Sequence, residues 1–305
     1  MGEAPSLVKP VASTKAGTAP SGAAIVTTRR ALLASFGLRT LSSIALIVAV
    51  IAGVLAPIGP FVFITMLFIG GGLWEYFDLL ERKGLQAFRW AGLLIGCSIP
   101  LITYLAAGTS VDGWVREGVA LWLLAGALAI CVIQFVRRES RDALTTVACT
   151  VFGVLYVAWL FSFLVRLKLL PHGAELVGFV VIVTKLGDMG AYLVGASLGR
   201  RLLIPRISPK KTVEGLVGGL LVSLLAALVL RPWLPRPAWS QAVILGLLLG
   251  MGTHAGDLIE SLFKRDCDTK DSGRAVPGLG GFLDVIDSLL FTIPVFYAYV
   301  RIVWF

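Results

Sequence analysis

The sequence predicts an all-α, polytopic integral membrane protein with about nine transmembrane helices. Hydrophobic residues make up 57% of the 305 residues and charged residues only 15%, against roughly 25% charged residues in soluble domains. The apolar residues are gathered in runs close to the roughly 20 residues that cross a bilayer. A soluble enzyme with buried helices is disfavoured, because too little polar sequence remains to cover a soluble surface.

Residues 1–35 are rich in Ala, Ser, Thr, Gly and Pro and show no apolar period, which predicts a disordered cytoplasmic tail. Residues 36–305 are expected to form a single transmembrane domain. Its predicted helices are 41–57, 60–78, 90–107, 118–136, 143–165, 175–198, 213–230, 240–262 and 282–303.

The basic residues predict the orientation of these helices. The net charge is +9, and most of the 27 lysines and arginines fall on one set of alternating loops. Because cytoplasmic loops carry an excess of Lys and Arg, this set is expected inside, with the N-terminus cytoplasmic and the C-terminus outside. Basic loops between apolar runs suit anionic lipid head groups, and no nucleic acid partner is expected.

The segment Gly252–Ser288 is expected to carry the chemistry, since it holds a large share of the 18 acidic residues. Asp257, Glu260, Ser261 and Lys264 follow the spacing of one helical face. Glu260 and Lys264 could form a structural ion pair. Asp257 would then have no evident partner, which favours a metal or a substrate there.

Asp284 and Asp287 form a second pair, spaced i, i+3 at the start of the last predicted helix. Acidic residues suit a helix N-terminus for purely structural reasons. Mg²⁺ also takes one or two carboxylates together with substrate phosphates. The preceding Gly280 and Gly281 would let a ligand approach the backbone, and basic residues lie upstream, so the binding interpretation is favoured.

A further polar group lies between residues 188 and 215. Asp188 follows Lys185 by one turn, which allows an intramembrane ion pair. The segment Ser208-Pro209-Lys210-Lys211-Thr212 is predicted to be a loop leading into a helix, where lysines and hydroxyls suit phosphate. From spacing alone, a simple positively charged cytoplasmic loop is an equally good interpretation.

These motifs together resemble the phosphatidate cytidylyltransferases, also called CDP-diacylglycerol synthases. The similar motifs are Asp188-x-Gly190-Ala191-Tyr192, Ser208-Pro209-Lys210-Lys211-Thr212-x-Glu214-Gly215, Gly256-Asp257-Leu258, Ser261-x-x-Lys264-Arg265-x4-Lys270-Asp271, Pro277-Gly278-x-Gly280-Gly281 and Asp284-x-x-Asp287. They occur in the family's order, and Trp74-Glu75 is a weaker match. Two departures are Leu279 where the family usually has His, and Val285 where it usually has Arg.

The resemblance implies a transmembrane catalytic domain that converts CTP and phosphatidate to CDP-diacylglycerol and diphosphate. Its active site would come mainly from residues 185–290 and lie at the cytoplasmic face of the bacterial inner membrane, with a homodimer as the suggested assembly. The implied catalytic residues are Asp257, Lys264, Asp284 and Asp287, of which the three aspartates would bind Mg²⁺ or a pair of cations. The implied substrate-binding residues are Ser208, Lys210, Lys211, Thr212, Ser261, Arg265, Lys270 and Asp188.

Other functions are compatible with the same residues. A CTP-dependent lipid-alcohol kinase, or a cytidylyltransferase acting on another lipid phosphate, would need a similar site. A transporter would place charged residues at the membrane midplane, whereas most charges here are predicted at one face. A catalytically inactive scaffold is the remaining alternative, suggested by Leu279 and Val285.

Overall fold

The computed structural model describes residues 48, 50–107, 112–137, 142–236, 238–269, 271–273, 275 and 280–304, with the side chains of 112–116 left aside. Within these residues, seven helices are long and apolar enough to cross a membrane, and an eighth apolar helix is shorter. The chain is therefore an integral membrane protein of the all-α class. The predicted tail, residues 1–35, lies outside the described residues.

Every predicted span from the second to the ninth corresponds to an observed helical segment. In order these are α2 (Ile58–Arg82), α3 (Arg89–Ala107), α4 (Asp112–Val136), the continuous segment of α5 (Ala143–Gly153), π-helical η1 (Val154–Trp159) and α6 (Leu160–Lys168), then α7 (Gly173–Leu198), α8 (Val213–Val229), α9 (Trp239–Asp266) and α10 (Phe282–Val303). A short 3₁₀ turn, η2 (Arg231–Trp233), joins α8 to α9. Of the first predicted span only the end is described, with residues 50–55 helical, so the total of nine remains a prediction.

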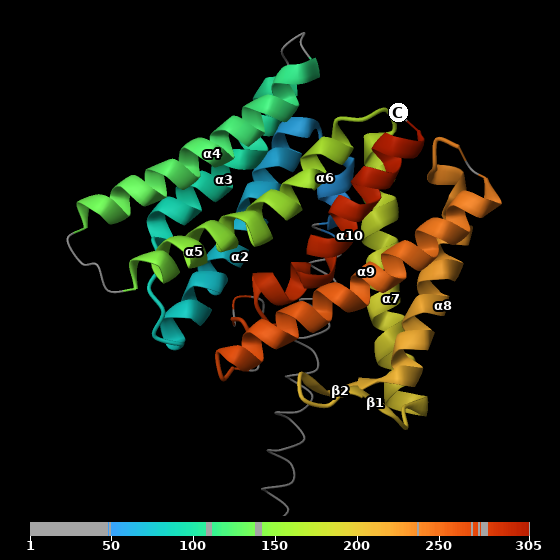
Figure 1. The fold of residues 1–305 in the computed structure, drawn as a ribbon. Helices are drawn as coiled ribbons and strands as arrows, with labels where there is room; N and C mark the ends of the chain where they lie inside the picture. Colours follow the sequence, from blue (N-terminus) through green and yellow to red (C-terminus); the bar gives the residue numbers. More distant parts are fainter. Residues whose placement is uncertain are drawn as a thin grey trace, which may run out of the picture.

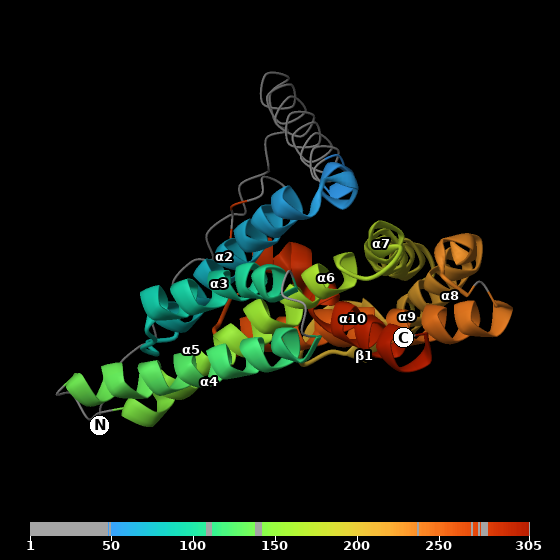
Figure 2. The same cartoon turned by 90° about the horizontal axis from the view of Figure 1, so that it is seen from above.

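Helix α10 lies in the middle of the bundle (Figures 1 and 2). It contacts α2 and α6 on one side and α7 and α9 on the other. Helices α3, α4 and α5 lie beyond α2 and α6, whereas α8 packs on the outer side of α7 and α9. The N-terminus of α10, which carries Asp284 and Asp287, is therefore surrounded by protein.

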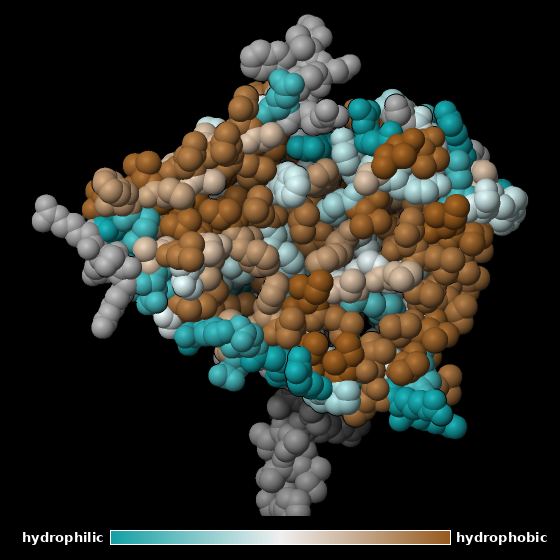
Figure 3. Space-filling view, in the orientation of Figure 1, coloured by the Kyte–Doolittle hydropathy of each residue, from teal (hydrophilic) through white to brown (hydrophobic). Residues whose placement is uncertain are grey.

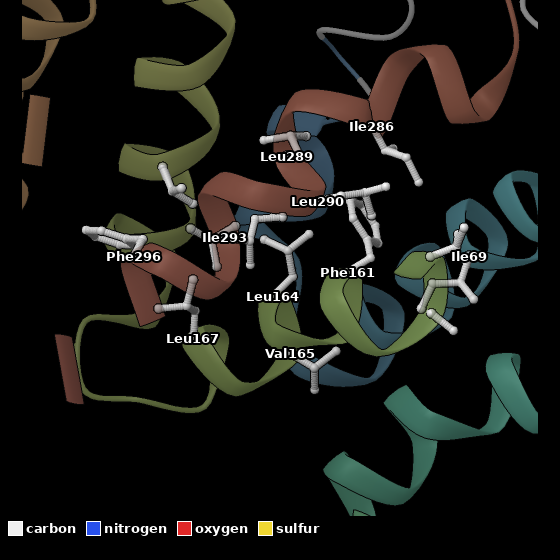
Figure 4. Close-up of a cluster of buried hydrophobic side chains, with 14 of the residues drawn as sticks. Ile69, Phe161, Leu164, Val165, Leu167, Ile286, Leu289, Leu290, Ile293 and Phe296 are labelled. Atoms are coloured by element: carbon white, nitrogen blue, oxygen red, sulfur yellow. The ribbon is translucent and has the colours of Figure 1, made fainter. Parts of the chain in front are cut away.

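The apolar face of α10 forms the core against α6 (Figure 4). Leu290, Ile293 and Phe296 are completely buried. Leu290 and Ile293 lie close to Phe161 and Leu164 of α6, and Phe296 stacks on Phe179 of α7. The face of the molecule seen in Figure 3 is also largely apolar across its middle, as contact with lipid tails requires. In lipid, helices associate through close packing rather than through a hydrophobic driving force, so the fit between helices sets the position of each polar group.

Glycines bring α7 and α8 into close contact. A Cβ placed on Gly190 of α7 would lie 2.6 Å from the Cβ of Val222 in α8. A Cβ on Gly218 of α8 would lie 2.5 Å from that of Val194 in α7. Small residues at such crossings allow backbones to approach in membrane helices.

Residues 202–212 form an antiparallel hairpin rather than the predicted loop. Strands β1 (Leu202–Ile204) and β2 (Ser208–Thr212) pair with Leu202 opposite Thr212 and Ile204 opposite Ser208. Pro209 is tolerated because a two-stranded sheet has only edge strands. The hairpin holds the Lys210-Lys211-Thr212 run in a defined position, which a loop would not do.

Several connections meet at the same end of the bundle as this hairpin. Lys83, just after α2, forms a hydrogen-bonded ion pair with Asp266 at the end of α9. The hydrogen bond to Asp266 raises the pKa of the Lys83 ammonium. The Arg265 Nε donates to the hairpin carbonyl of Ile207 at 3.4 Å. Hydrophilic side chains gather along this edge of the molecule in Figure 3.

Candidate active site

The candidate site lies where the last turns of α7 and α9, the hairpin and the first turn of α10 meet. Its central ion is the ammonium of Lys264 in α9. This Nζ lies 3.0 Å from Glu260 Oε2 and 2.7 Å from Asp284 Oδ1. The Glu260 side chain is only 1% exposed and that of Lys264 13%. The predicted Glu260–Lys264 pair is thus present and is shared with α10.

Asp284 connects this ion pair to the beginning of α10. Its Oδ2 accepts hydrogen bonds from the backbone N–H groups of Gly281, at 2.8 Å, and Ser272, at 3.2 Å. The first N–H groups of a helix have no partner within the helix, and a carboxylate there is favourable. Gly280 has φ +105°, a conformation for which glycine is suited.

Asp287 lies one turn further along α10 and is 9% exposed. Its carboxylate lies near those of Asp257 and Glu260 in α9. The neighbouring Ser288 donates through its Oγ to Asp188 Oδ2 of α7 at 2.9 Å and accepts from Lys185 Nζ at 2.9 Å. Carboxylates from three helices therefore converge.

A pocket of about 470 Å³ opens beside this cluster. Asp188 and Asp257 line it together with residues of β2, which supplies four of the predicted substrate-binding residues, Ser208, Lys210, Lys211 and Thr212. The Lys211 Nζ lies 3.3 Å from Asp257 Oδ2. The pocket thus combines ammonium and hydroxyl groups with buried carboxylates, an arrangement suited to a polyphosphate and a cation.

The local sequence fixes the hairpin at the mouth of this pocket. Thr212 is the N-cap of α8, and its Oγ1 accepts from the N–H of Gly215 at 3.1 Å. Glu214 Oε2 accepts from the N–H groups of Arg200 and Arg201, at 3.0 and 3.1 Å. Thr and Glu at these positions satisfy backbone groups, so Glu214 has a structural function here.

Comparison with known proteins identifies the family. The family model described as the cytidylyltransferase family matches residues 37–303. The chain belongs to this family. It is 33% identical over 262 residues to the phosphatidate cytidylyltransferase of Bacillus subtilis, a match that covers 81% of this chain and 95% of that protein.

Two further relatives differ in how much of their length is matched. The phosphatidate cytidylyltransferase of Synechocystis is 33% identical over 257 residues, covering 75% of this chain and 84% of the relative. The Escherichia coli relative, named uncharacterized protein YnbB, is 40% identical over 183 residues, covering 58% of this chain. The match spans 61% of that relative's length.

Three further residues predicted for the site are Arg265, Ser261 and Lys270. Arg265 is exposed at the end of α9, where its Nη1 donates to the carbonyl of Thr269 at 3.4 Å. Ser261 is half-buried and makes no hydrogen bond with the described residues. Lys270 lies outside the described residues. Ser261 and Arg265 are not among the residues that line the pocket.

Three residues in this site were given little or no functional weight by the sequence analysis. His254 of α9 lines the pocket, with its Nε2 3.1 Å from the carbonyl oxygen of Leu216. Ser288 joins Lys185 to Asp188, as described above. Glu75 of α2 is buried, with its carboxylate against the backbone of Gly273 and Gly281. The sequence could have pointed to Glu75, because a carboxylate inside an apolar span is unfavourable without a partner.

The carboxylates expected to bind Mg²⁺ differ in how their oxygens are engaged in the structure. Within the described part of the chain, no group of three or more His, Cys, Asp or Glu residues is arranged to hold a metal ion. Asp257 and Asp287 nevertheless fit a site completed by substrate phosphates. Among the described residues, the nearby Asp188 Oδ1 and Glu260 Oε1 are buried without a hydrogen-bonding partner. Asp284 has both oxygens engaged, which favours it as an anchor for Lys264.

Proposed function

We propose that this chain is a phosphatidate cytidylyltransferase, which makes CDP-diacylglycerol and diphosphate from CTP and phosphatidate. The observation that carries the proposal is the pocket of about 470 Å³, whose lining includes Lys210, Lys211, Thr212 and Asp257. It adjoins a buried carboxylate cluster in an apolar helical body. The two relatives that carry this name support it.

In the proposed reaction, a phosphate oxygen of phosphatidate attacks the α-phosphorus of CTP in line. A new P–O bond forms, the bond from the α-phosphorus to the bridging oxygen breaks, and diphosphate leaves with that electron pair. A phosphate monoester is largely ionised at neutral pH, so no dedicated general base is needed. Both substrates are anions, so the site must neutralise charge and hold them in line.

Different residues would neutralise the charge of the substrates and hold them in position. Lys211 lies in the pocket and would bind the triphosphate, together with Lys210 and the hydroxyls of Ser208 and Thr212. Asp257 and Asp287 would hold Mg²⁺, which supplies charge neutralisation for the triphosphate and the leaving diphosphate. Lys264, fixed by Glu260 and Asp284, would present a positive charge between the two substrates.

We also propose that the site faces the cytoplasm and that two copies of the chain form a homodimer. The basic connections beside the site suit the cytoplasmic face of a bacterial inner membrane, where CTP is available and the lipid phosphate lies at the surface. Arg265 and Lys270 would bind phosphates at the rim, and Ser261 would contact substrate from α9. The homodimer is tested by the molar mass of the protein in detergent from light scattering.

The decisive experiment uses purified full-length protein in detergent with phosphatidate, Mg²⁺ and CTP labelled at either the α- or the γ-phosphate. Transfer of the α-label to lipid, with release of γ-label as diphosphate, is the expected result. Transfer of the γ-label to a lipid alcohol would instead establish a kinase. If another lipid phosphate accepts the α-label faster than phosphatidate does, the substrate assignment is wrong.

Two variants locate the reaction. Asp284→Asn and Lys264→Ala should abolish transfer, with activity measured on the fraction of each variant that elutes in the monodisperse peak of the wild type. Asp266→Asn is the matched control, because that carboxylate lies on the same helix, is 65% exposed and faces away towards Lys83. Near-full activity of both site variants would refute the site assignment.

A further inference from the structure

Glu75 of α2 lies far in sequence from the site but directly behind it. Its side chain is only 5% exposed, within a helix long and apolar enough to span the membrane. Glu75 Oε2 accepts hydrogen bonds from the backbone N–H of Leu283 at 2.9 Å and from Ser272 Oγ at 3.3 Å. A carboxylate at such a position is retained only with specific partners.

The backbone at Gly273 and at Gly281 packs against this carboxylate. A Cβ placed on either glycine would overlap the Glu75 oxygens. Gly281 is the N-cap of α10. One side chain from α2 therefore contacts both the start of α10 and the backbone at Gly273, and only glycine at these two positions leaves it room.

The contacts of Glu75 continue to the catalytic ion pair through Ser272. The Ser272 hydroxyl donates to Glu75, whereas its backbone N–H donates to Asp284 Oδ2 at 3.2 Å. Asp284 in turn holds Lys264 at 2.7 Å. Leu283 N–H, the second contact of Glu75, is one of the helix-start donors that α10 cannot satisfy internally.

We propose that Glu75 is a positioning residue, which fixes the start of α10 so that Asp284 and Lys264 lie where the reaction needs them. Its effect on catalysis rests on the proposed function, whereas its effect on the backbone does not. The arrangement depends on the length of the side chain and on one acceptor oxygen, and not on negative charge. A role as metal ligand or base would require the charge.

Three substitutions separate these roles. Glu75→Gln keeps the length and an acceptor oxygen, and its NH₂ group would occupy the place of Oε1, which has no hydrogen-bonding partner among the described residues. Glu75→Asp keeps the charge but is one methylene too short to reach Leu283. Glu75→Ala removes both the acceptor oxygens and the charge. Glu81→Ala is the control, since Glu81 lies on the same helix with its side chain 77% exposed.

The measurements are kcat and KM for CTP, and hydrogen exchange of the peptide that contains Leu283. In Glu75→Ala and Glu75→Asp, we expect kcat to fall about 100-fold, as for a misplacement of about 1 Å. The KM for CTP should change little, because the CTP pocket is formed by other elements, and exchange at Leu283 should accelerate. Glu75→Gln should stay close to wild type in all three, as should Glu81→Ala.

Two results would overturn the proposal. One is Glu75→Gln losing as much activity as Glu75→Ala while the exchange of Leu283 remains slow, because charge would then matter. The other is Glu75→Ala with unchanged exchange. If the wild type forms no CDP-lipid, the proposed function fails, but the exchange data still decide whether Glu75 holds α10. If Glu75→Ala does not fold, Glu75→Gln still tests the proposal, because it preserves the packing.

Discussion

At the scale of single residues, the site is defined by charges that are buried in pairs. Lys264 is largely buried between Glu260 and Asp284, so each ion is stabilised only while its partner remains. Removal of one partner from a buried pair leaves an uncompensated charge. The two predictions at this scale follow from which partner is removed.

Lys264→Met should destabilise the protein by about 3 to 5 kcal/mol, because two carboxylates lose their cation. The measurement is thermal denaturation in detergent, followed by loss of the monodisperse peak. Lys83→Met is the control, since the Lys83–Asp266 pair lies at the surface with its side chains 34% and 65% exposed, and it should change the midpoint little. Equal shifts in both variants would show that the Lys264 cluster is not a buried unit.

Lys211→Met should raise the KM for CTP about tenfold, because a hydrogen bond or ion pair to a charged group contributes on the order of 1.5 to 3 kcal/mol. Arg206→Met removes a similar charge from the exposed tip of the same hairpin and should change KM much less. Steady-state kinetics with varied CTP measure both. A fall in kcat alone for Lys211→Met would mean that Lys211 serves only to pair with Asp257.

Sequence spacing predicted some of these residues and not others, for a physical reason. Asp257, Glu260 and Lys264 are neighbours because they share one helix, and helical periodicity is readable from the chain. Their partners cannot be read from periodicity. The hydrogen bonds of Lys264 with Asp284 and of Glu75 with Leu283 form because different helices pack together. Single-sequence patterns contain no such information, so Glu75 was only a weak motif match.

At the scale of elements, close approach of α7 and α8 positions the pocket. Both helices line it, α7 through Asp188 and α8 through Gly215 and Leu216. Their spans were predicted to within a few residues, because long apolar runs are clear signals. The hairpin between them was missed, because Ser-Pro-Lys-Lys-Thr shows no alternation of apolar and polar residues.

Gly190→Ala should therefore destabilise the bundle by about 1 to 3 kcal/mol, as overpacking does, because the new Cβ would lie 2.6 Å from that of Val222. Gly118→Ala in α4 is the control, since a Cβ there meets nothing within 4 Å, and alanine favours a helix by up to about 1 kcal/mol. Thermal stability in detergent measures both. Equal stability of the two variants would contradict the close packing of α7 on α8.

At the scale of the whole molecule, the bundle has two unlike ends. The hairpin and the end of α9 lie at one end, whereas the C-terminal end of α10 lies at the other (Figure 1). Three helices, α8, α9 and α10, separate the hairpin from the C-terminus. The alternation of basic loops predicted this arrangement from sequence, since each span reverses the side of the next loop.

The orientation is tested with a reporter that is active only outside the cytoplasm, fused after Trp304 or inserted at Arg206 in the hairpin. We expect activity from the first fusion and none from the second, because three crossings place the two positions on opposite sides and the basic hairpin favours the cytoplasm. A cytoplasm-specific reporter at the same two positions should give the reverse pattern and controls for expression. Activity of both fusions on one side would mean that α8, an apolar helix of only 17 residues, does not cross the membrane. Reversed sides would instead put the pocket outside, where it could not take CTP from the cytoplasm.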